Sequence, residues 1–89
     1  MKNNKKYSLL FLIENHYQKN RMQLFEQLRQ VLNVSVSTIQ RYMYAEIGAQ
    51  TTMAAEHLFK LATFFNVKPT DLFTDEYKKH LNFIVFEID

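Results

Sequence analysis

Apolar residues recur at helical spacing in the first part of this chain. They are Leu9, Leu10, Ile13 and Tyr17 in the first stretch, and Leu24, Leu28, Val31 and Leu32 in the second. Intervals of three and four residues place such positions on one side of an α-helix. The pattern predicts one helix over residues 7–19 and another from Met22 to Asn33, a residue type that tolerates the left-handed conformation past a helix end.

A third, shorter helix is predicted after a connection of about three residues. Ser35 and Ser37 both suit its N-cap, because a serine hydroxyl accepts a hydrogen bond from a free amide of the first turn. Ser37 and Gln40 also have capping-box spacing. The apolar stripe of this helix is Val36, Ile39, Tyr42 and Met43, and the helix ends at residues 44–46. Because the connection is so short, the second and third helices must cross sharply.

Residues 46–53 read as a loop, in which Gly48 is the position best suited to a positive φ. Thr51 or Thr52 is expected to cap a fourth helix that ends at Asn66. Its buried face would consist of Ala55, Leu58, Leu61, Ala62 and Phe65. Pro69 suits the first position of a fifth helix running to about Tyr77, because a missing amide costs nothing there.

The tail is rich in β-branched and aromatic residues and predicts a strand over Leu81–Asp89. An isolated strand is unstable in water. We expect it to pair with its own copy across a two-fold axis and to form a homodimer. The residues of that contact would be Leu81, Phe83, Val85 and Ile88. The alternative is that the tail packs on its own core against residues 9–12, as a hairpin with an N-terminal strand.

The composition favours one fold class and excludes several kinds of functional site. The 89 residues are 47% apolar, with one glycine, one proline and no cysteine. Scarce turn residues favour an all-α fold. Too few glycines are present for a P-loop or a dinucleotide fingerprint, and no thiol can serve as a nucleophile or zinc ligand. The longest apolar run, Leu9–Ile13, is far short of the roughly 20 residues of a membrane span. We therefore expect a soluble, cytoplasmic protein.

Charge is unevenly distributed along the chain, although the net charge is only +2. Residues 1–44 hold seven basic and two acidic side chains, and residues 45–89 hold four basic and seven acidic ones. The first half therefore has a charge of +5 and the second −3. The first half is therefore where a polyanion is expected to bind, and the alternative is a solvated face whose charge asymmetry arose by chance.

A helix, a three-residue turn and a second short helix describe a helix-turn-helix. In this chain the motif resembles that of the Cro/phage-repressor (XRE-type) DNA-binding family, from about Met22 to Thr74. In the turn the matching positions are Leu28, Leu32, Val34, Ile39 and Tyr42, and in LFKLATFFNVKPTDLF they are Leu58, Leu61, Ala62, Phe65, Val67 and Leu72. The chain departs from the family pattern at two positions. Arg29 stands where a small residue is usual and must extend outward unless the crossing opens, and Asn33 replaces a glycine.

The resemblance implies that the third helix enters the DNA major groove. The residues that would contact base edges are Val36, Ser37, Gln40 and Arg41. Those that would contact phosphates are Lys19, Arg21, Arg29 and Thr38. The first six residues would be a flexible basic arm in which Lys2, Lys5 and Lys6 follow the DNA backbone or enter the minor groove.

The sequence thus predicts a five-helix, repressor-like helix-turn-helix domain with a C-terminal β-strand. The arm is residues 1–6, the DNA-binding domain residues 7–77, and the dimerisation element residues 78–89. The predicted function is regulation of transcription at a short palindromic site, without catalysis, cofactor or metal, since the three histidines are too widely separated to form a ligand pair. The alternative function is a protein-interaction module on the same scaffold.

Overall fold

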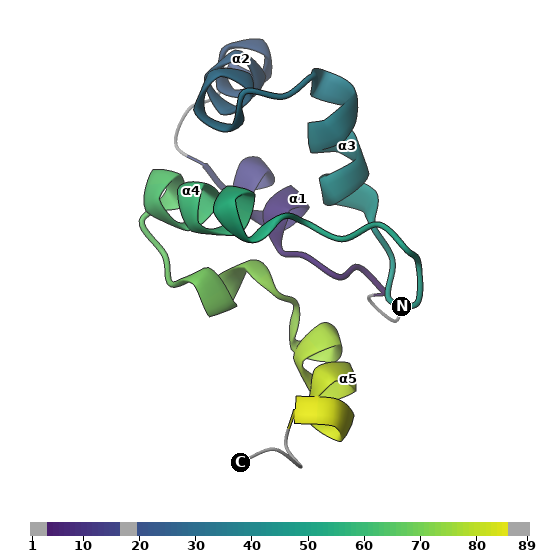
Figure 1. Ribbon diagram of the computed structural model, residues 1–89. Coiled ribbons are helices and arrows are strands. Elements are labelled where there is room, and N and C mark those ends of the chain that lie inside the picture. The colour runs from purple at the N-terminus through teal and green to yellow at the C-terminus, as the bar shows by residue number, and fades with distance from the viewer. Residues whose placement is uncertain (1–3, 17–19, 86–89) are drawn as a thin grey trace.

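The computed structural model describes residues 4–16 and 20–85, and it is helical throughout (Figure 1). The elements in order are α1 (Leu9–Glu14), α2 (Arg21–Leu32), α3 (Val36–Tyr44), α4 (Ala55–Phe65), the 3₁₀ helix η1 (Pro69–Leu72) and α5 (Asp75–Val85). Within these residues the β-type pairing consists of two isolated bridges, Lys5 with Glu46 and Tyr7 with Phe73. The prediction of a helical fold is therefore confirmed.

One hydrophobic core joins these helices. α2 packs on α3 and α4, α1 packs on α3, and α4 packs on η1. The largest fully buried side chains come from all five of these elements; they are Leu9, Leu24, Leu28, Ile39, Met43, Leu61 and Leu72. Burying apolar surface from every element in one place supplies most of the driving force for folding. The helical stripes predicted for α2 and α3 are the buried faces, with one exception. Val36, predicted as part of the α3 stripe, is 38% exposed.

Asparagine residues end two of the helices, as predicted. Asn33 after α2 and Asn66 after α4 adopt the left-handed conformation, with φ of 56° and 57°. This conformation lets a backbone amide at the helix end bond a carbonyl of the last turn. Gly48 has a φ of 96°, so its predicted role in the middle loop is also confirmed.

The N-terminal segment, defined here as residues 4–8, differs from the prediction of a free arm and an early helix. α1 begins only at Leu9. The Lys6 N–H donates to the Ala45 oxygen at 2.8 Å, and the Thr74 N–H donates to the Lys6 oxygen at 3.0 Å. The segment therefore joins the end of α3 to the start of α5. Residues 1–3 and 17–19 lie outside the described residues.

Tyr7 explains why this segment is held in place rather than extended into solvent. Its side chain is 3% exposed, and its hydroxyl accepts a 2.7 Å hydrogen bond from the Met53 N–H. Its ring lies against those of Tyr42, Phe73 and Tyr77. Burial raises the pKa of the Tyr7 hydroxyl, so the neutral form is favoured in the folded state.

The predicted cap of α4 is wrong, whereas Pro69 stands at the first position of η1 as predicted. α4 follows Ala54, and neither Thr51 nor Thr52 caps it. The Thr52 hydroxyl instead donates to the Gln50 oxygen, so it is engaged within the loop. The proline-led helix is also shorter than predicted, because η1 ends at Leu72 and α5 begins separately. The Thr74 hydroxyl accepts from the Tyr77 N–H at 3.2 Å and so caps α5.

The predicted C-terminal strand is likewise corrected. Residues 81–85 lie in α5, and residues 86–89, with Ile88, lie outside the described residues. Asp75 and Glu76 in the first turn of α5 favour helix there, because carboxylates stabilise the positive helix N-terminus. Helix propagation from this start outweighs the β propensity of the tail. Residues 81, 83 and 85 then no longer share one face, as they would in a strand.

Replacing Tyr7 with phenylalanine tests the bond between the N-terminal segment and the loop. The Tyr7→Phe protein should lose about 1–3 kcal/mol of unfolding free energy, because the buried Met53 N–H loses its acceptor. Denaturant titration measures this loss. Tyr44→Phe is the matched control, since Tyr44 is 53% exposed, and it should change stability by less than about 0.5 kcal/mol. Equal effects of the two changes would contradict the assignment.

Candidate nucleic-acid interface

α2 and α3 form a helix-turn-helix around a short, well-defined turn. Asn33 reverses the chain in the left-handed conformation, and the Val34 N–H donates to the Arg29 oxygen at 3.2 Å. Ser35 is extended and caps α3. Leu28 and Leu32 of α2 are buried in the same core as Ile39, Tyr42 and Met43 of α3. The buried residues fix the crossing and leave the other side of α3 in solvent.

The solvent side of α3 carries the four residues predicted to meet base edges. Val36 is 38% exposed, and Ser37, Gln40 and Arg41 are also exposed. Positions i, i+1, i+4 and i+5 fall on one face of a helix. The structure therefore brings all four together, and Tyr44 continues the face toward the C-terminal end of the helix.

Ser35 caps α3, which decides between the two predicted caps. Its Oγ accepts from the Thr38 N–H at 3.4 Å. The Thr38 hydroxyl lies 3.4 Å from the Ser35 Oγ and accepts from Arg41 Nη2 at 3.3 Å. The alternative capping box between Ser37 and Gln40 does not form. Ser37 and Gln40 consequently make no side-chain hydrogen bond to the described residues.

The predicted phosphate-contacting residues are more dispersed than the predicted base-contacting ones. Arg21 is exposed at the start of α2. Arg29 extends outward, as expected for the tight crossing, and its Nε lies 3.3 Å from the Glu26 Oε2. Thr38 is half-buried within the cap of α3. Lys19 lies outside the described residues.

The sequence did not reveal that Lys5 lies beside α3. Lys5 Nζ lies 5.7 Å from the centre of the Tyr44 ring, a cation–π contact. A hollow of about 360 Å³ separates α3 from the loop that follows it, and it is lined by Arg41, Tyr44, Ala45, Glu46, Ala49 and Thr51. The sequence signal for this site is Tyr44, because helical spacing places it on the same face as Gln40 and Arg41. Placing Lys5 there required knowledge of the tertiary fold.

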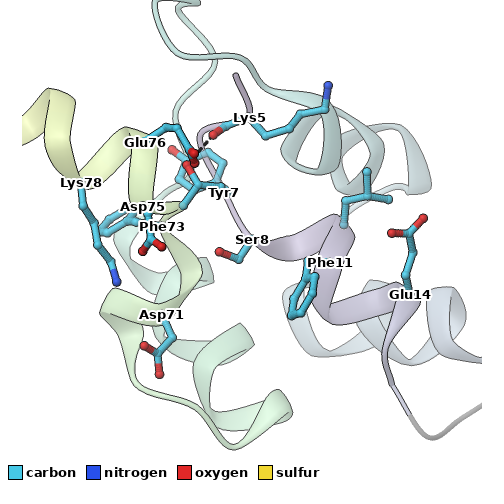
Figure 2. A pocket seen from close by; sticks show the side chains of 12 residues that line it. Lys5, Tyr7, Ser8, Phe11, Glu14, Asp71, Phe73, Asp75, Glu76 and Lys78 are labelled. Carbon is cyan, nitrogen blue, oxygen red and sulfur yellow. Dashed lines mark hydrogen bonds between the residues drawn. The ribbon is translucent and has the colours of Figure 1, made fainter. Parts of the chain in front are cut away.

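A second groove is unsuited to a polyanion. It lies between α1 and the η1–α5 region, has a volume of about 510 Å³, and is drawn in Figure 2. Its lining includes Glu14, Asp71, Asp75 and Glu76 against two lysines, and Phe11 beside it is 64% exposed. This acidic surface involves no residue of α3. The negative charge of the second half of the chain is thus partly gathered here.

Histidine contacts in the described residues are those of packing. The Tyr42 hydroxyl lies 2.8 Å from His57 Nδ1, and His16 stacks on Phe64. In the described part of the chain no three His, Asp or Glu residues are grouped as a metal would require. Over the same residues, no helix is both long enough and apolar enough to span a bilayer.

Comparison with known protein families matches residues 13–78 to the Cro/C1-type HTH DNA-binding domain. The chain belongs to this family. The match covers α2, α3, α4 and η1 in full, so the resemblance seen in the sequence is confirmed. Neither the curated proteins nor the solved structures gave a significant match.

Membership of the Cro/C1-type family assigns DNA binding to the helix-turn-helix described above. Three parts of this member lie outside the matched residues. They are the N-terminal segment with Lys5 and Lys6, residues 9–12 of α1, and the end of α5. The attachment of the N-terminal segment to the α3–α4 loop is therefore a feature of this chain rather than of the family match.

The start of α3 can be tested with two serine variants. Ser35→Ala should cost about 0.5–2 kcal/mol of unfolding free energy, because the first turn loses its cap. Ser37→Ala, the matched control, should stay within about 0.5 kcal/mol of the parent protein, because its side chain is exposed and unbonded. Thermal or denaturant unfolding measures both. If Ser37→Ala costs more unfolding free energy than Ser35→Ala, then Ser37 caps α3 and the assignment to Ser35 is wrong.

Proposed function

We propose that this protein is a cytoplasmic, repressor-like transcription regulator that reads a short palindromic DNA site with α3 in the major groove. The observation that carries the proposal is the exposed face of α3 in a family that binds DNA. Val36, Ser37, Gln40 and Arg41 share that face. Occupying the site would block transcription.

The chemistry of that face suits base recognition. Arg41 can donate two hydrogen bonds to guanine, and Gln40 can pair with adenine. Val36 offers an apolar contact to a thymine methyl, and Ser37 can donate or accept. Arg41 makes one exposed hydrogen bond, to Thr38 at 3.3 Å, which a base contact can replace at low cost.

Phosphate contacts would come from the residues around this face. Arg21 stands at the N-terminus of α2, where the helix dipole also favours an anion. Arg29 is held by Glu26 in an exposed i,i+3 pair, and such pairs contribute about 0–1 kcal/mol. Arg29 can therefore exchange Glu26 for a phosphate. Lys19 and Thr38 complete the proposed phosphate contacts.

A homodimer is also part of the proposal, with α5 in place of the strand that the structure excludes over residues 81–85. α5 extends away from the rest of the domain in Figure 1. Leu81, one of the predicted contact residues, lies on this helix and is partly exposed. Pairing two such helices would cover Leu81, and a palindromic site requires two α3 helices about 34 Å apart.

A second candidate function is binding of another protein. The specific observation is Phe11, which is 64% exposed beside the acidic groove of Figure 2. An exposed aromatic residue in such a setting favours contact with a basic, partly apolar protein segment. The groove involves no residue of α3, so this function is independent of the DNA-binding face.

DNA binding is tested by titrating the protein with mixed-sequence duplex and with its selected preferred site, using fluorescence anisotropy at rising salt. Affinity should fall steeply with salt as phosphates are neutralised. Arg41→Ala should lose about 1–3 kcal/mol at the preferred site and relax sequence choice. Arg21→Ala should instead weaken all duplexes alike and reduce the salt slope by about 1.

Lys78→Ala is the control for these arginine variants, because Lys78 lines the acidic groove and not α3. It should leave the affinity for the preferred site nearly unchanged. Absence of binding at low salt, or binding that does not respond to salt, would contradict the proposed function and would favour the protein-binding candidate.

The proposed dimer is tested by light scattering over a range of concentrations. Leu81→Glu should shift the protein to monomers, because a charge would enter the apolar contact. Lys79→Glu is the matched control on the same helix, and it should retain the dimer, since Lys79 is exposed. A parent protein that stays monomeric at every concentration, or an unchanged mass for Leu81→Glu, would contradict this arrangement.

A further inference from the structure

Met22 and Phe11 are the two most exposed large apolar side chains of the described residues. Met22 is 83% exposed in the first turn of α2, and Phe11 is 64% exposed on α1. A single exposed apolar side chain is common on protein surfaces. These two differ from that ordinary case, because they stand in surroundings of opposite charge.

Phe11 stands among carboxylates. It lies in the acidic groove, between Glu14 of α1 on one side and Asp71 and Asp75 on the other (Figure 2). Four carboxylates and two lysines line this groove, which gives it a formal charge of −2. None of the four, of which the last is Glu76, forms an ion pair within the described residues. The groove therefore presents an aromatic ring with unneutralised negative charge on both sides.

Met22 stands beside a positive charge. Its neighbour Arg21 is exposed, and the first turn of α2 contains no acidic residue. The Arg21 side chain forms no ion pair within the described part of the chain. The free amides at the N-terminus of a helix add positive character to the same place. The start of α2 is therefore an apolar side chain with unneutralised positive charge next to it.

The start of α2 and the acidic groove are complementary surfaces that do not meet within one molecule, since neither Arg21 nor Met22 lines the groove. They can meet between two molecules. Opposite charges attract the two surfaces, and a methionine sulfur makes favourable contacts with an aromatic ring. Such a contact is heterologous, because it joins one surface of a molecule to a different surface of the next. Both patches are small, so the contact is weak and reversible.

We propose that free copies of this protein associate head to tail, with Met22 and Arg21 of one copy in the acidic groove of the next. Met22 covers the Phe11 ring, and Arg21 pairs with the carboxylates beside it. A second copy, rather than a different protein, is then the occupant of the groove. This contact does not depend on the proposed function, but one consequence does. Because Arg21 is proposed to contact a DNA phosphate, DNA and the neighbouring copy compete for that side chain.

The first experiment records NMR spectra of the full-length ¹⁵N-labelled protein at low salt while its concentration is raised. The amide signals of Ser8, Phe11 and Glu14 in the groove should shift together with those of Arg21 and Met22. Added salt should reverse the shifts, because it screens the attraction between the two surfaces. Signals that do not change with concentration would overturn the proposal and leave the groove to a different protein.

Two serine variants test the residues of the contact. Phe11→Ser and Met22→Ser should each weaken self-association about tenfold, because each removes one of the two apolar partners. Both side chains are exposed, so both variants should fold. Phe59→Ser is the matched control, since Phe59 is 58% exposed but lies outside the groove, and it should associate as the parent protein does. Equal effects of all three substitutions would overturn the proposal.

A mixture of the two variants tests the direction of the contact. The Phe11→Ser protein keeps an intact start of α2, and the Met22→Ser protein keeps an intact groove, so together they should form one contact. With the ¹⁵N label in the Phe11→Ser protein alone, the signals of Arg21 and Met22 should shift when the Met22→Ser protein is added. The signals of Ser8 and Glu14 should stay in place. Shifts at both sites, or at neither, would overturn the head-to-tail arrangement.

Duplex DNA tests the competition for Arg21. Adding the preferred duplex to the associated parent protein should return the signals of Ser8 and Glu14 to their positions in dilute protein. If DNA binds, as seen from shifts at Gln40 and Arg41, and the groove signals remain shifted, the competition is overturned. If DNA does not bind at all, the proposed function is contradicted, and the preceding experiments still decide the head-to-tail contact.

Discussion

The Lys6 ammonium group is the contact on which the arrangement of the proposed DNA-binding face depends. It replaces its water shell with two carbonyl oxygens at 2.6 Å and so fixes the path of the chain between α3 and α4. Tyr7 reinforces this path from the next position by accepting the Met53 N–H. A loop with a single glycine and few apolar side chains would otherwise have little to order it. Residues distant in sequence thus give the end of α3 a defined neighbour.

Charge and burial then divide the molecule into two kinds of surface. The exposed side of α3 carries Gln40 and Arg41, and Lys5 stands beside it over the Tyr44 ring. The acidic groove between α1 and α5 contains no residue of α3, although Lys5 also lines it, and its carboxylates would repel phosphates (Figure 2). Although the net charge is only +2, basic and acidic residues are gathered on different surfaces, which suits a DNA-binding protein. The family match assigns DNA binding, and this division supports the proposal that the α3 surface contacts the DNA.

The parts that could be predicted from sequence depend on local physics. The apolar stripes of α2 and α3 and the left-handed positions at Asn33 and Asn66 follow from periodicity and backbone preference. The proposed base-contacting face also follows, because helical spacing alone brings its residues together. The predictions that were wrong concern residues whose interaction partners are far away in the chain. Lys6 looked like a solvated arm because its acceptors lie 43 and 45 residues away. The tail looked like a strand because its helix begins at a cap, Thr74, that precedes it.

Hydrogen exchange of four loop amides in the free protein tests the central claim most directly, which is that the N-terminal segment holds the α3–α4 loop. The account predicts slow exchange at Ile47 and Met53, whose N–H groups are bonded to Asn4 and Tyr7. It predicts fast exchange at Gln50 and Thr52, whose N–H groups have no acceptor among the described residues. Uniformly fast exchange at all four amides would show that the segment does not hold the loop and would contradict the account.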